Sequence, residues 1–278
     1  MLSSLAINEL VERSLKEDLG SGDFTTDCAV PRELQGSARI LAKADGIICG
    51  LPVAEAVFQM LDRNLQCRRL VEEGDPVQPG CDIFQISGRL QSILHGERTA
   101  LNFMQRLSGI ATKTAAWVRE IDQYPARLAD TRKTTPGLRL LEKYAVQVGG
   151  GCNHRLALDG GILIKENHIR AAGGIKAAVK AVRERAPFTL RIEVEVTNLT
   201  ELAEALSVAP DIIMLDNMDL ATMQKAVAIT GGRALLEASG NVTFERLQEI
   251  AATGVDYISS GALTHSYSSL DLSLLIMR

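Results

Sequence analysis

The 278-residue sequence contains no apolar run long enough to cross a lipid bilayer. Charged side chains interrupt residues 1–20, so this stretch lacks the continuous apolar core of a signal peptide. Its apolar residues follow helical spacing instead, which predicts an amphipathic helix that ends at Gly20. The predicted apolar face consists of Leu5, Leu10, Val11, Leu15 and Leu19. We therefore expect a cytoplasmic protein that has no contact with a membrane.

Paired cysteines and metal-binding spacings are also missing. The five cysteines are scattered, and no two of them form a Cys-x-x-Cys pair. This argues against a disulfide framework and a structural zinc site, and it favours a reducing compartment. The sequence contains neither a His-x-His nor a His-Glu-x-x-His spacing, which argues against a tightly held transition metal.

A large net charge is absent as well. The net charge is −4 at pH 7, so the composition gives no indication of nucleic-acid binding. The charge is uneven along the chain, because residues 127–170 contain eight Lys or Arg and only four Asp or Glu. A cationic excess confined to one region favours a small anionic ligand over a polyanion.

The sequence up to about residue 109 combines helical and β-like patterns. The β-like runs are SARILAKADGIICG, LQCRRLV and CDIFQISG, and turn pairs such as Asp45-Gly46 and Pro79-Gly80 separate them. A long helical pattern over residues 90–121 leads into the rest of the chain. We expect residues 1–109 to form an α+β domain with an antiparallel sheet, which residues 267–278 can join.

Residues 110–266 repeat one unit, in which an apolar run ends in polar residues and a helical pattern follows. The six runs are ARLAD, GILI, LRIEV, DIIML, ALLEA and VDYI. Buried strands that alternate with amphipathic helices indicate parallel βα units. Six such units are close to a full ring, so they favour an α/β barrel over an open sheet. No Gly-x-Gly-x-x-Gly follows any run, which argues against a dinucleotide-binding fold.

Polar residues follow each of the predicted strands. In a barrel the carboxyl ends of all strands surround one mouth, so these residues should converge although they lie far apart in the sequence. They are Arg132, Lys133, Lys165, Glu195, Asp216, Ser239 and Ser260. A solvated strand end explains any one of them alone, but it explains the whole set poorly.

The predicted mouth is cationic on one side. Thr135 and Pro136 have the residue types of a helix cap and a first helical position. A helix start at this point would bring backbone N–H groups, which favour anions, close to Arg132. The pair His154-Arg155 follows a run of three glycines, residues 149–151, and adds further donors. These groups together imply a ligand with several negative charges, since Arg matches carboxylates and Lys suits phosphate.

Carboxylates and phosphate-binding loops complete the predicted mouth. Glu195 and Asp216 can hold Mg²⁺, bind sugar hydroxyls or stabilise a developing positive charge, and Glu193 shares a strand face with Glu195. Two Ser-Gly pairs follow the final two strands, where many barrels bind phosphate through backbone N–H groups. The residues of these loops are Ser239, Gly240, Asn241, Ser260 and Gly261, with His265 nearby. Phosphoribosyl pyrophosphate (PRPP) together with a small polycarboxylate fits all of these groups.

The segment ADTRKTTPGLRLLEKYAVQVGGGCNHRLALDGGILIKENHI resembles the signature of the quinolinate phosphoribosyltransferase family, a type II phosphoribosyltransferase family. Supporting stretches include HGERTALNFMQRLSGIAT, IEVEVTNL, IIMLDNM, LEASGN and ISSGALTHS. The resemblance implies an N-terminal α+β open-faced sandwich and a C-terminal, incomplete TIM-like α/β barrel. It also implies transfer of phosphoribosyl from PRPP to quinolinate with decarboxylation, Mg²⁺ bound with PRPP, no organic cofactor, and a homodimer.

The resemblance assigns a role to each residue of the predicted site. The quinolinate carboxylates would be held by Arg98 of the partner subunit and by Arg132, His154, Arg155 and Lys165. The catalytic residues would be Lys133, Glu195 and Asp216, the two acids acting with Mg²⁺ directly or through PRPP. Phosphate would be surrounded by Lys133, Ser239, Gly240, Asn241, Ser260, Gly261 and His265.

Three other interpretations stay open at this point. A related family encoded with molybdenum transport genes has the same fold, but its members usually lack the His154-Arg155 pair. A barrel lyase or aldolase could form a Schiff base at Lys165, because a strand end can present such a lysine. A binding protein without catalytic activity would use the same anion-binding groups.

Overall fold

The computed structural model describes residues 3–277 and contains two compact units. The sandwich unit consists of the described residues of Met1–Ala115, Thr135–Gly150 and Ser266–Arg278, and the barrel unit consists of Ala116–Thr134 and Gly151–His265. The predicted domain limits at residues 109 and 266 stay a prediction. No helix within residues 3–277 has both the length and the hydrophobicity needed to span a bilayer.

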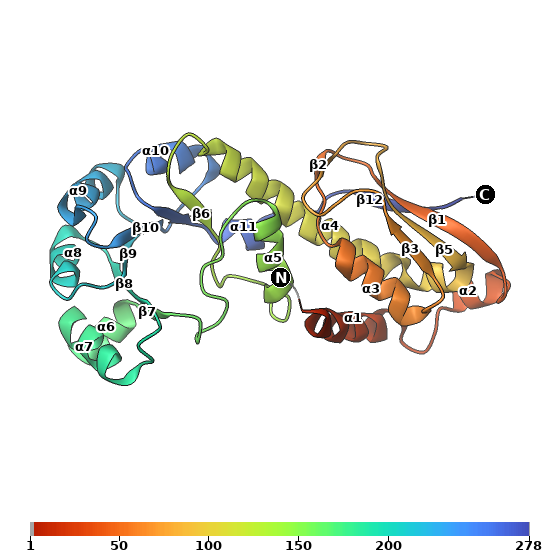
Figure 1. Ribbon diagram of the computed structural model, residues 1–278, viewed down its shortest axis with the longest axis horizontal. Coiled ribbons are helices and arrows are strands. Elements are labelled where there is room, and N and C mark those ends of the chain that lie inside the picture. The colour runs from red at the N-terminus through yellow and green to blue at the C-terminus, as the bar shows by residue number, and fades with distance from the viewer. Residues whose placement is uncertain (1–2, 278) are drawn as a thin grey trace. The chain divides into compact units, whose positions relative to one another are not determined.

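The sandwich unit is built on a four-stranded antiparallel sheet (Figure 1). In spatial order its strands are β12 (Leu272–Met277), β1 (Gln35–Ala42), β5 (Asp82–Arg89) and β3 (Gln66–Arg69). Every second residue of β1 from Ala38 onward is fully buried, as expected for a sheet with one covered face. A short pair, β2 (Gly46–Ile47) with β4 (Pro76–Val77), lies outside this sheet.

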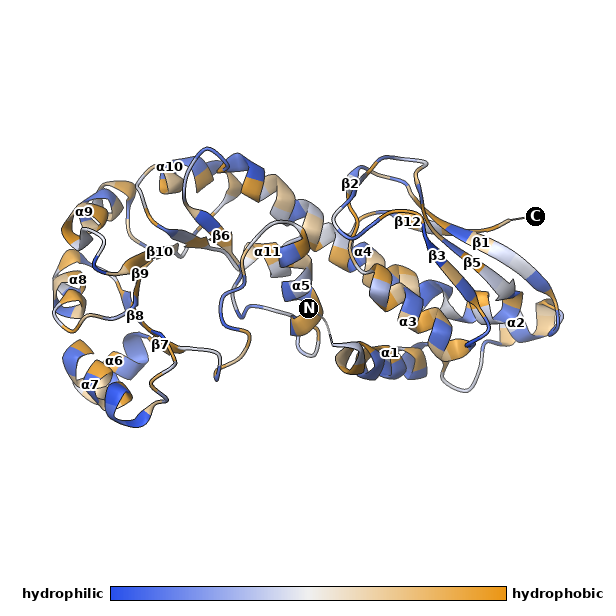
Figure 2. Ribbon diagram, in the orientation of Figure 1, coloured by the Kyte–Doolittle hydropathy of each residue, from blue (hydrophilic) through white to orange (hydrophobic). Residues whose placement is uncertain are grey.

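Helices of the same unit bury their apolar sides, and Phe58 of α3 stacks on Phe84 of the sheet with 6.2 Å between ring centroids. The helices of this unit are α1 (Ser4–Leu19), α2 (Phe24–Ala29), α3 (Leu51–Leu61), α5 (Arg139–Val148) and α4 (Leu90–Glu120), of which residues 116–120 belong to the barrel unit. Figure 2 shows hydrophobic and hydrophilic residues alternating along α4, the pattern of a helix with one buried side. This arrangement confirms the predicted α+β fold with an antiparallel sheet.

Two local predictions for this unit need correction, and one helix was missed. Leu5 is 79% exposed, and the buried side of α1 is formed by Ile7, Val11 and Leu15 at intervals of four residues. Helix α3 was not predicted. The helix expected to start at Pro136 starts at Arg139, because Thr135–Leu138 first forms a turn.

The barrel unit is a six-stranded sheet in which every neighbouring pair is parallel. In spatial order its strands are β6 (Arg127–Ala129), β11 (Tyr257–Ser259), β10 (Leu235–Ser239), β9 (Ile212–Asp216), β8 (Ile192–Val196) and β7 (Ile162–Ile164). Cys152 forms an isolated parallel bridge with Ala129 beyond the edge strand β6. The ring is therefore an incomplete α/β barrel, as predicted.

Helices lie outside the curved sheet of the barrel unit (Figure 1). They are α6 (Glu166–Ala172), α7 (Ile175–Arg185), α8 (Leu199–Leu206), α9 (Leu220–Thr230), α10 (Leu247–Ala251) and α11 (Ala262–His265), with a 3₁₀ turn at Phe244–Arg246. In β8 the residues Ile192, Val194 and Val196 are buried, and the alternate residues Glu193 and Glu195 share the other face. Because the strands are parallel, all their carboxyl ends lie at the same end of the barrel.

Candidate active site

A cavity of about 540 Å³ lies at the carboxyl ends of the barrel strands, and we call it the mouth cavity. Most of the residues predicted from the strand ends line it, so the structure brings together positions that are up to about a hundred residues apart in sequence. The predicted residues among its lining are Arg132, Lys133, His154, Arg155, Lys165, Asp216, Ser239, Gly240 and Asn241. Their convergence follows from the parallel order of the strands.

Asp130, directly after β6, connects the segment 131–133 to the segment 153–155 by hydrogen bonds. Its carboxylate is fully buried and accepts hydrogen bonds from the backbone N–H of His154 at 2.9 Å and from Asn153 Nδ2 at 2.6 Å. The backbone of Asp130 also pairs with Cys152. The segment 131–133 is thus held beside the segment 153–155, although about twenty residues separate them.

Arg132 and Arg155 both line the mouth cavity, and neither has a full set of hydrogen-bond partners among residues 3–277. The Nε atoms of both are buried and have no hydrogen-bond partner among residues 3–277. Burial lowers the pKa of Arg155, and the positive charge of Arg132 lowers it further, although Glu193 acts in the opposite direction. Like charges that repel and buried donors that lack acceptors are both relieved by a bound anion.

The two predicted carboxylates of the mouth, Glu195 and Asp216, each interact with a neighbouring side chain. Lys165 Nζ lies 2.7 Å from Glu195 Oε2, so these side chains form an ion pair across β7 and β8. Asn217 Nδ2 donates to Asp216 Oδ2 at 2.8 Å. Glu195 reaches the site through its contact with Lys165 and does not itself line the mouth cavity.

The first predicted phosphate loop has a strained backbone. Gly240 has a φ of +85°, and Asn217 and Asn241 have positive φ values of 55° and 49°. Asn241 Nδ2 donates to Asn217 Oδ1 at 2.9 Å, which joins the loops after β9 and β10. A Cβ at Gly240 would overlap the Asn217 amide, so glycine is required here by both conformation and space. Such strain commonly marks a ligand-binding loop.

The second predicted phosphate loop packs against Lys133. Thr264 Oγ1 donates to the Lys133 carbonyl oxygen at 2.8 Å, and a Cβ at Gly261 would lie 2.7 Å from Lys133 Cδ. Ser260 is buried and its hydroxyl accepts from Ala262 N–H at 3.3 Å, while His265 is exposed at the end of α11. None of Ser260, Gly261 and His265 lines the mouth cavity directly.

Arg98 belongs to the sandwich unit, where it is exposed on α4. Its predicted role in a partner subunit's site therefore concerns a surface-accessible side chain.

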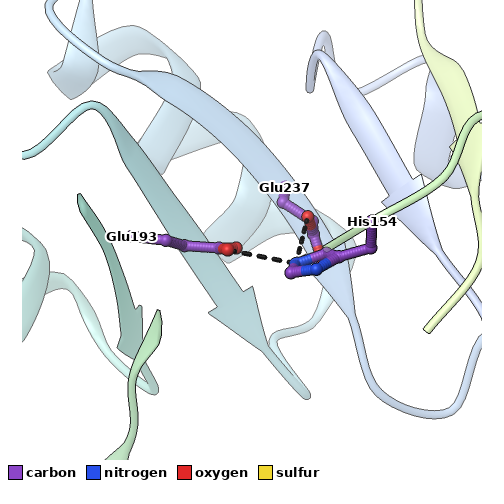
Figure 3. Close-up of side chains that lie close together, drawn as sticks. All are labelled: His154, Glu193 and Glu237. Carbon is purple, nitrogen blue, oxygen red and sulfur yellow. Dashed lines mark hydrogen bonds and ion pairs between the residues drawn. The ribbon is translucent and has the colours of Figure 1, made fainter. Parts of the chain in front are cut away.

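A buried cluster of His154, Glu193 and Glu237 was missed as a unit by the sequence prediction (Figure 3). His154 Nε2 lies 3.0 Å from Glu193 Oε2 and 3.6 Å from Glu237 Oε2. The interior of an α/β barrel is usually filled by branched apolar side chains, so a glutamate inside a buried strand is itself a signal. That signal is present in the runs RIEVEV and ALLEAS, where both glutamates point into the barrel.

The fold and the mouth define an α/β-barrel protein with a cavity lined by Arg132, Lys133, Arg155 and Lys165 at the carboxyl ends of its strands. A family model described as "Quinolinate phosphoribosyl transferase, C-terminal domain" matches residues 110–275, and its N-terminal counterpart matches residues 23–108. The chain belongs to the quinolinate phosphoribosyl transferase family.

Relatives of similar length support this membership. The probable nicotinate-nucleotide pyrophosphorylase (carboxylating) of Synechocystis is 47% identical, over 99% of this chain and 94% of its own. The corresponding protein of Bacillus subtilis is 43% identical, over 98% and 94%. Among solved structures, the nicotinate-nucleotide pyrophosphorylase from Francisella tularensis superposes with a TM-score of 0.95 at 44% identity, covering 100% of this chain and 98% of that one.

Proposed function

We propose that this protein transfers the phosphoribosyl group of PRPP to quinolinate and decarboxylates the product. The products are nicotinate mononucleotide, CO₂ and pyrophosphate, in de novo NAD biosynthesis. The relatives named above carry this activity in their names, and the chain spans nearly their whole length. The observation that carries the proposal is the pair Arg132 and Arg155, which line one cavity and each have a buried Nε without a hydrogen-bond partner among residues 3–277.

Quinolinate is a planar ring with two adjacent carboxylates, and it suits the cationic side of the mouth. The planar forks of Arg132 and Arg155 each match one carboxylate, and Lys165 supplies a further charge on the same side. His154, next to Arg155, belongs to the same predicted subsite. Binding by two carboxylates fixes the plane of the ring, so the ring nitrogen can be aimed at C1 of the ribose.

PRPP is expected on the side of the glycine loops. Backbone N–H groups of Ser239–Asn241 and Ser260–Gly261 would bind its 5-phosphate, with His265 nearby. Lys133, which packs against the second loop, would bind the pyrophosphate and stabilise it as it leaves. Glu195 and Asp216 would accept hydrogen bonds from ribose hydroxyls and would stabilise positive charge at C1.

The carboxylates of Glu195 and Asp216 also suit Mg²⁺, which prefers oxygen ligands and is commonly bound through few carboxylates together with substrate phosphates. Bound Mg²⁺ would neutralise charge on the pyrophosphate leaving group. No organic cofactor is required, because the N-ribosylated pyridinium ring accepts the electrons released when the 2-carboxylate leaves.

Purified protein incubated with quinolinate, PRPP and Mg²⁺ is expected to release CO₂ and nicotinate mononucleotide in equal amounts. Radiolabelled quinolinate gives the CO₂, and chromatography gives the nucleotide. Nicotinate replacing quinolinate is the control, since it has no 2-carboxylate to lose and binds through one carboxylate only. Absence of both products from quinolinate would refute the proposed activity.

We further propose a homodimer in which Arg98 of each subunit completes the quinolinate subsite of the other. Arg98→Ala and Arg132→Ala are each expected to be nearly inactive as pure proteins. When the two variants are mixed and allowed to exchange subunits, one site of each mixed dimer carries neither substitution, so activity should return to about a quarter of the wild-type value. If Arg98 acted within its own chain, mixing would restore nothing.

A Schiff-base lyase at Lys165 is a weaker candidate. A nucleophilic lysine needs a free amine directed at the substrate, whereas Lys165 Nζ is engaged with Glu195 Oε2 at 2.7 Å. The molybdenum-linked relatives share the fold, and CO₂ release from quinolinate distinguishes them from the proposed enzyme.

A further inference from the structure

The barrel interior has a second cavity, of about 330 Å³, which reaches the amino ends of several strands. We call it the rear cavity. Its lining includes Ile162, Ile212 and Tyr257, the first residues of β7, β9 and β11, which places it at the amino ends of the strands. His154, Arg155 and Glu237 line both cavities. These side chains therefore form the wall between the mouth and the rear of the barrel.

Glu237 and His154 of this wall are in close contact with a second carboxylate, Glu193, which lines the rear cavity. The Glu193 and Glu237 side chains are each only 5% exposed, and both lie within 3.6 Å of His154 Nε2. Ser259 Oγ donates to Glu237 Oε1 at 2.5 Å. One oxygen of Glu193 is buried without a hydrogen-bond partner among residues 3–277. Two buried carboxylates this close to a single imidazole favour a state in which one of them holds a proton.

The proposed reaction needs a proton at one defined atom. When the C2–carboxylate bond breaks, CO₂ leaves and the electron pair stays on C2, next to the positively charged ring nitrogen. C2 must then take up a proton to give nicotinate mononucleotide. At that moment the mouth cavity holds the nucleotide and pyrophosphate, so the interior side of the barrel is the remaining route for the proton.

We propose that Glu237 gives this proton to C2 and is reprotonated by water from the rear cavity, an inference that rests on the proposed function. In the first step the Glu237 O–H bond breaks, a C2–H bond forms, and the carboxylate keeps the electron pair of its O–H bond. In the second step the carboxylate takes a proton from a water molecule in the rear cavity. The hydroxide that remains diffuses out through this cavity and is neutralised by the buffer. The step needs no oxidant or reductant.

The groups around Glu237 shift its pKa toward the value that a proton donor needs near neutral pH. Burial raises the pKa of Glu237 to about 7, and the nearby charge of Glu193 contributes in the same direction, whereas His154 and Ser259 act to lower it. Arg155 is part of the same wall. On the neighbouring strands, the residues in register with Glu237 are Met214 of β9 and Tyr257 of β11, which carry no charge. The proton is therefore present below pH 7 and is lost as the pH rises through about 7.

The test is the pH profile of kcat in four proteins: wild type, Glu237→Gln, Glu193→Gln and Ser259→Ala. In wild type kcat should fall on the alkaline side as Glu237 loses its proton. Removing the Glu193 charge should move this fall to lower pH, and removing the Ser259 hydroxyl should move it to higher pH, because these groups act on the Glu237 pKa in opposite directions. A merely structural role would not produce opposite shifts.

Glu237→Gln should lower kcat by about 10²- to 10⁴-fold, the usual contribution of a general acid, while the Kd of quinolinate changes less than twofold. Single-turnover reactions in equal parts H₂O and D₂O should give a different deuterium content at C2 in this variant than in wild type. If Glu237→Gln is poorly folded, the other two variants still carry the test.

The inference would be overturned if the pH profile of kcat did not shift in Glu193→Gln and Ser259→Ala. It would also be overturned if the deuterium content at C2 were the same in Glu237→Gln as in wild type. Loss of quinolinate binding in Glu237→Gln would also overturn it, because the residue would then act before the proton transfer. A wild-type protein that forms no nicotinate mononucleotide would instead refute the proposed function, which is a separate result.

Discussion

Replacing Arg132 by alanine is expected to lower kcat/KM for quinolinate by about 10²- to 10⁴-fold, with little change in the KM of PRPP. Each charge-assisted hydrogen bond from a buried guanidinium contributes about 1.5–3 kcal/mol, and a fork can make two of them. Arg132 lines the mouth cavity, and its buried Nε has no hydrogen-bond partner among residues 3–277, so the protein itself leaves this donor unsatisfied. Steady-state kinetics with each substrate varied in turn measure the effect.

One further variant separates the effect of charge from that of geometry at this position, and a second variant elsewhere serves as the control. Arg132→Lys keeps the positive charge but loses the planar fork, so its activity should lie between those of wild type and the alanine variant. Arg170→Ala is the matched control, because the Arg170 side chain is 75% exposed and forms its ion pair with Glu166 on its own helix. Wild-type kinetics in Arg132→Ala would contradict the quinolinate assignment.

The ends of the barrel strands are predictable from sequence because a buried parallel strand is an almost continuous apolar run. The first polar residue after such a run marks the carboxyl end, as Lys165 does after GILI and Asp216 does after DIIML. The common orientation of parallel strands then brings these residues to one mouth. Local pattern and topology together were sufficient for most of the candidate site.

Glu237 could not be found by that rule because it lies within a run and not after it. Its partner Glu193 is forty-four residues earlier in the chain, and the contact of both with His154 depends on strand register. The sequence shows that a charge is buried in each strand, but not that the two charges meet. Only the tertiary structure identifies them as one cluster.

The helices that were misjudged depend on distant contacts in the same way. The N-terminus of α3 is satisfied by Glu73, whose Oε1 accepts from the N–H groups of Gly50 and Leu51 at 2.9 and 2.6 Å. The sequence just before this helix contains no residue whose side chain caps it, so the start of α3 could not be predicted locally. The expected cap Thr135 instead donates its own N–H to Glu142 Oε2 at 3.0 Å, which stabilises a turn before α5 begins.

Gly240→Ala is expected to raise the KM of PRPP by about tenfold to a hundredfold, which corresponds to losing one charge-assisted hydrogen bond to phosphate. The new methyl group would overlap the Asn217 side chain, so the loop must shift and its N–H groups would no longer point at the phosphate. The Kd of quinolinate, measured by calorimetry without PRPP, should stay within about twofold because the cationic subsite is built on other loops.

Gly173→Ala is the matched control for this substitution. Gly173 has the same φ of +85° as Gly240, but a Cβ there meets no atom within 4 Å. Both variants should therefore lose about 1–2 kcal/mol of stability from the left-handed backbone, whereas only Gly240→Ala should affect PRPP. If the two variants had equal KM values for PRPP, backbone strain alone would explain the result, and the loop after β10 would not be the phosphate site.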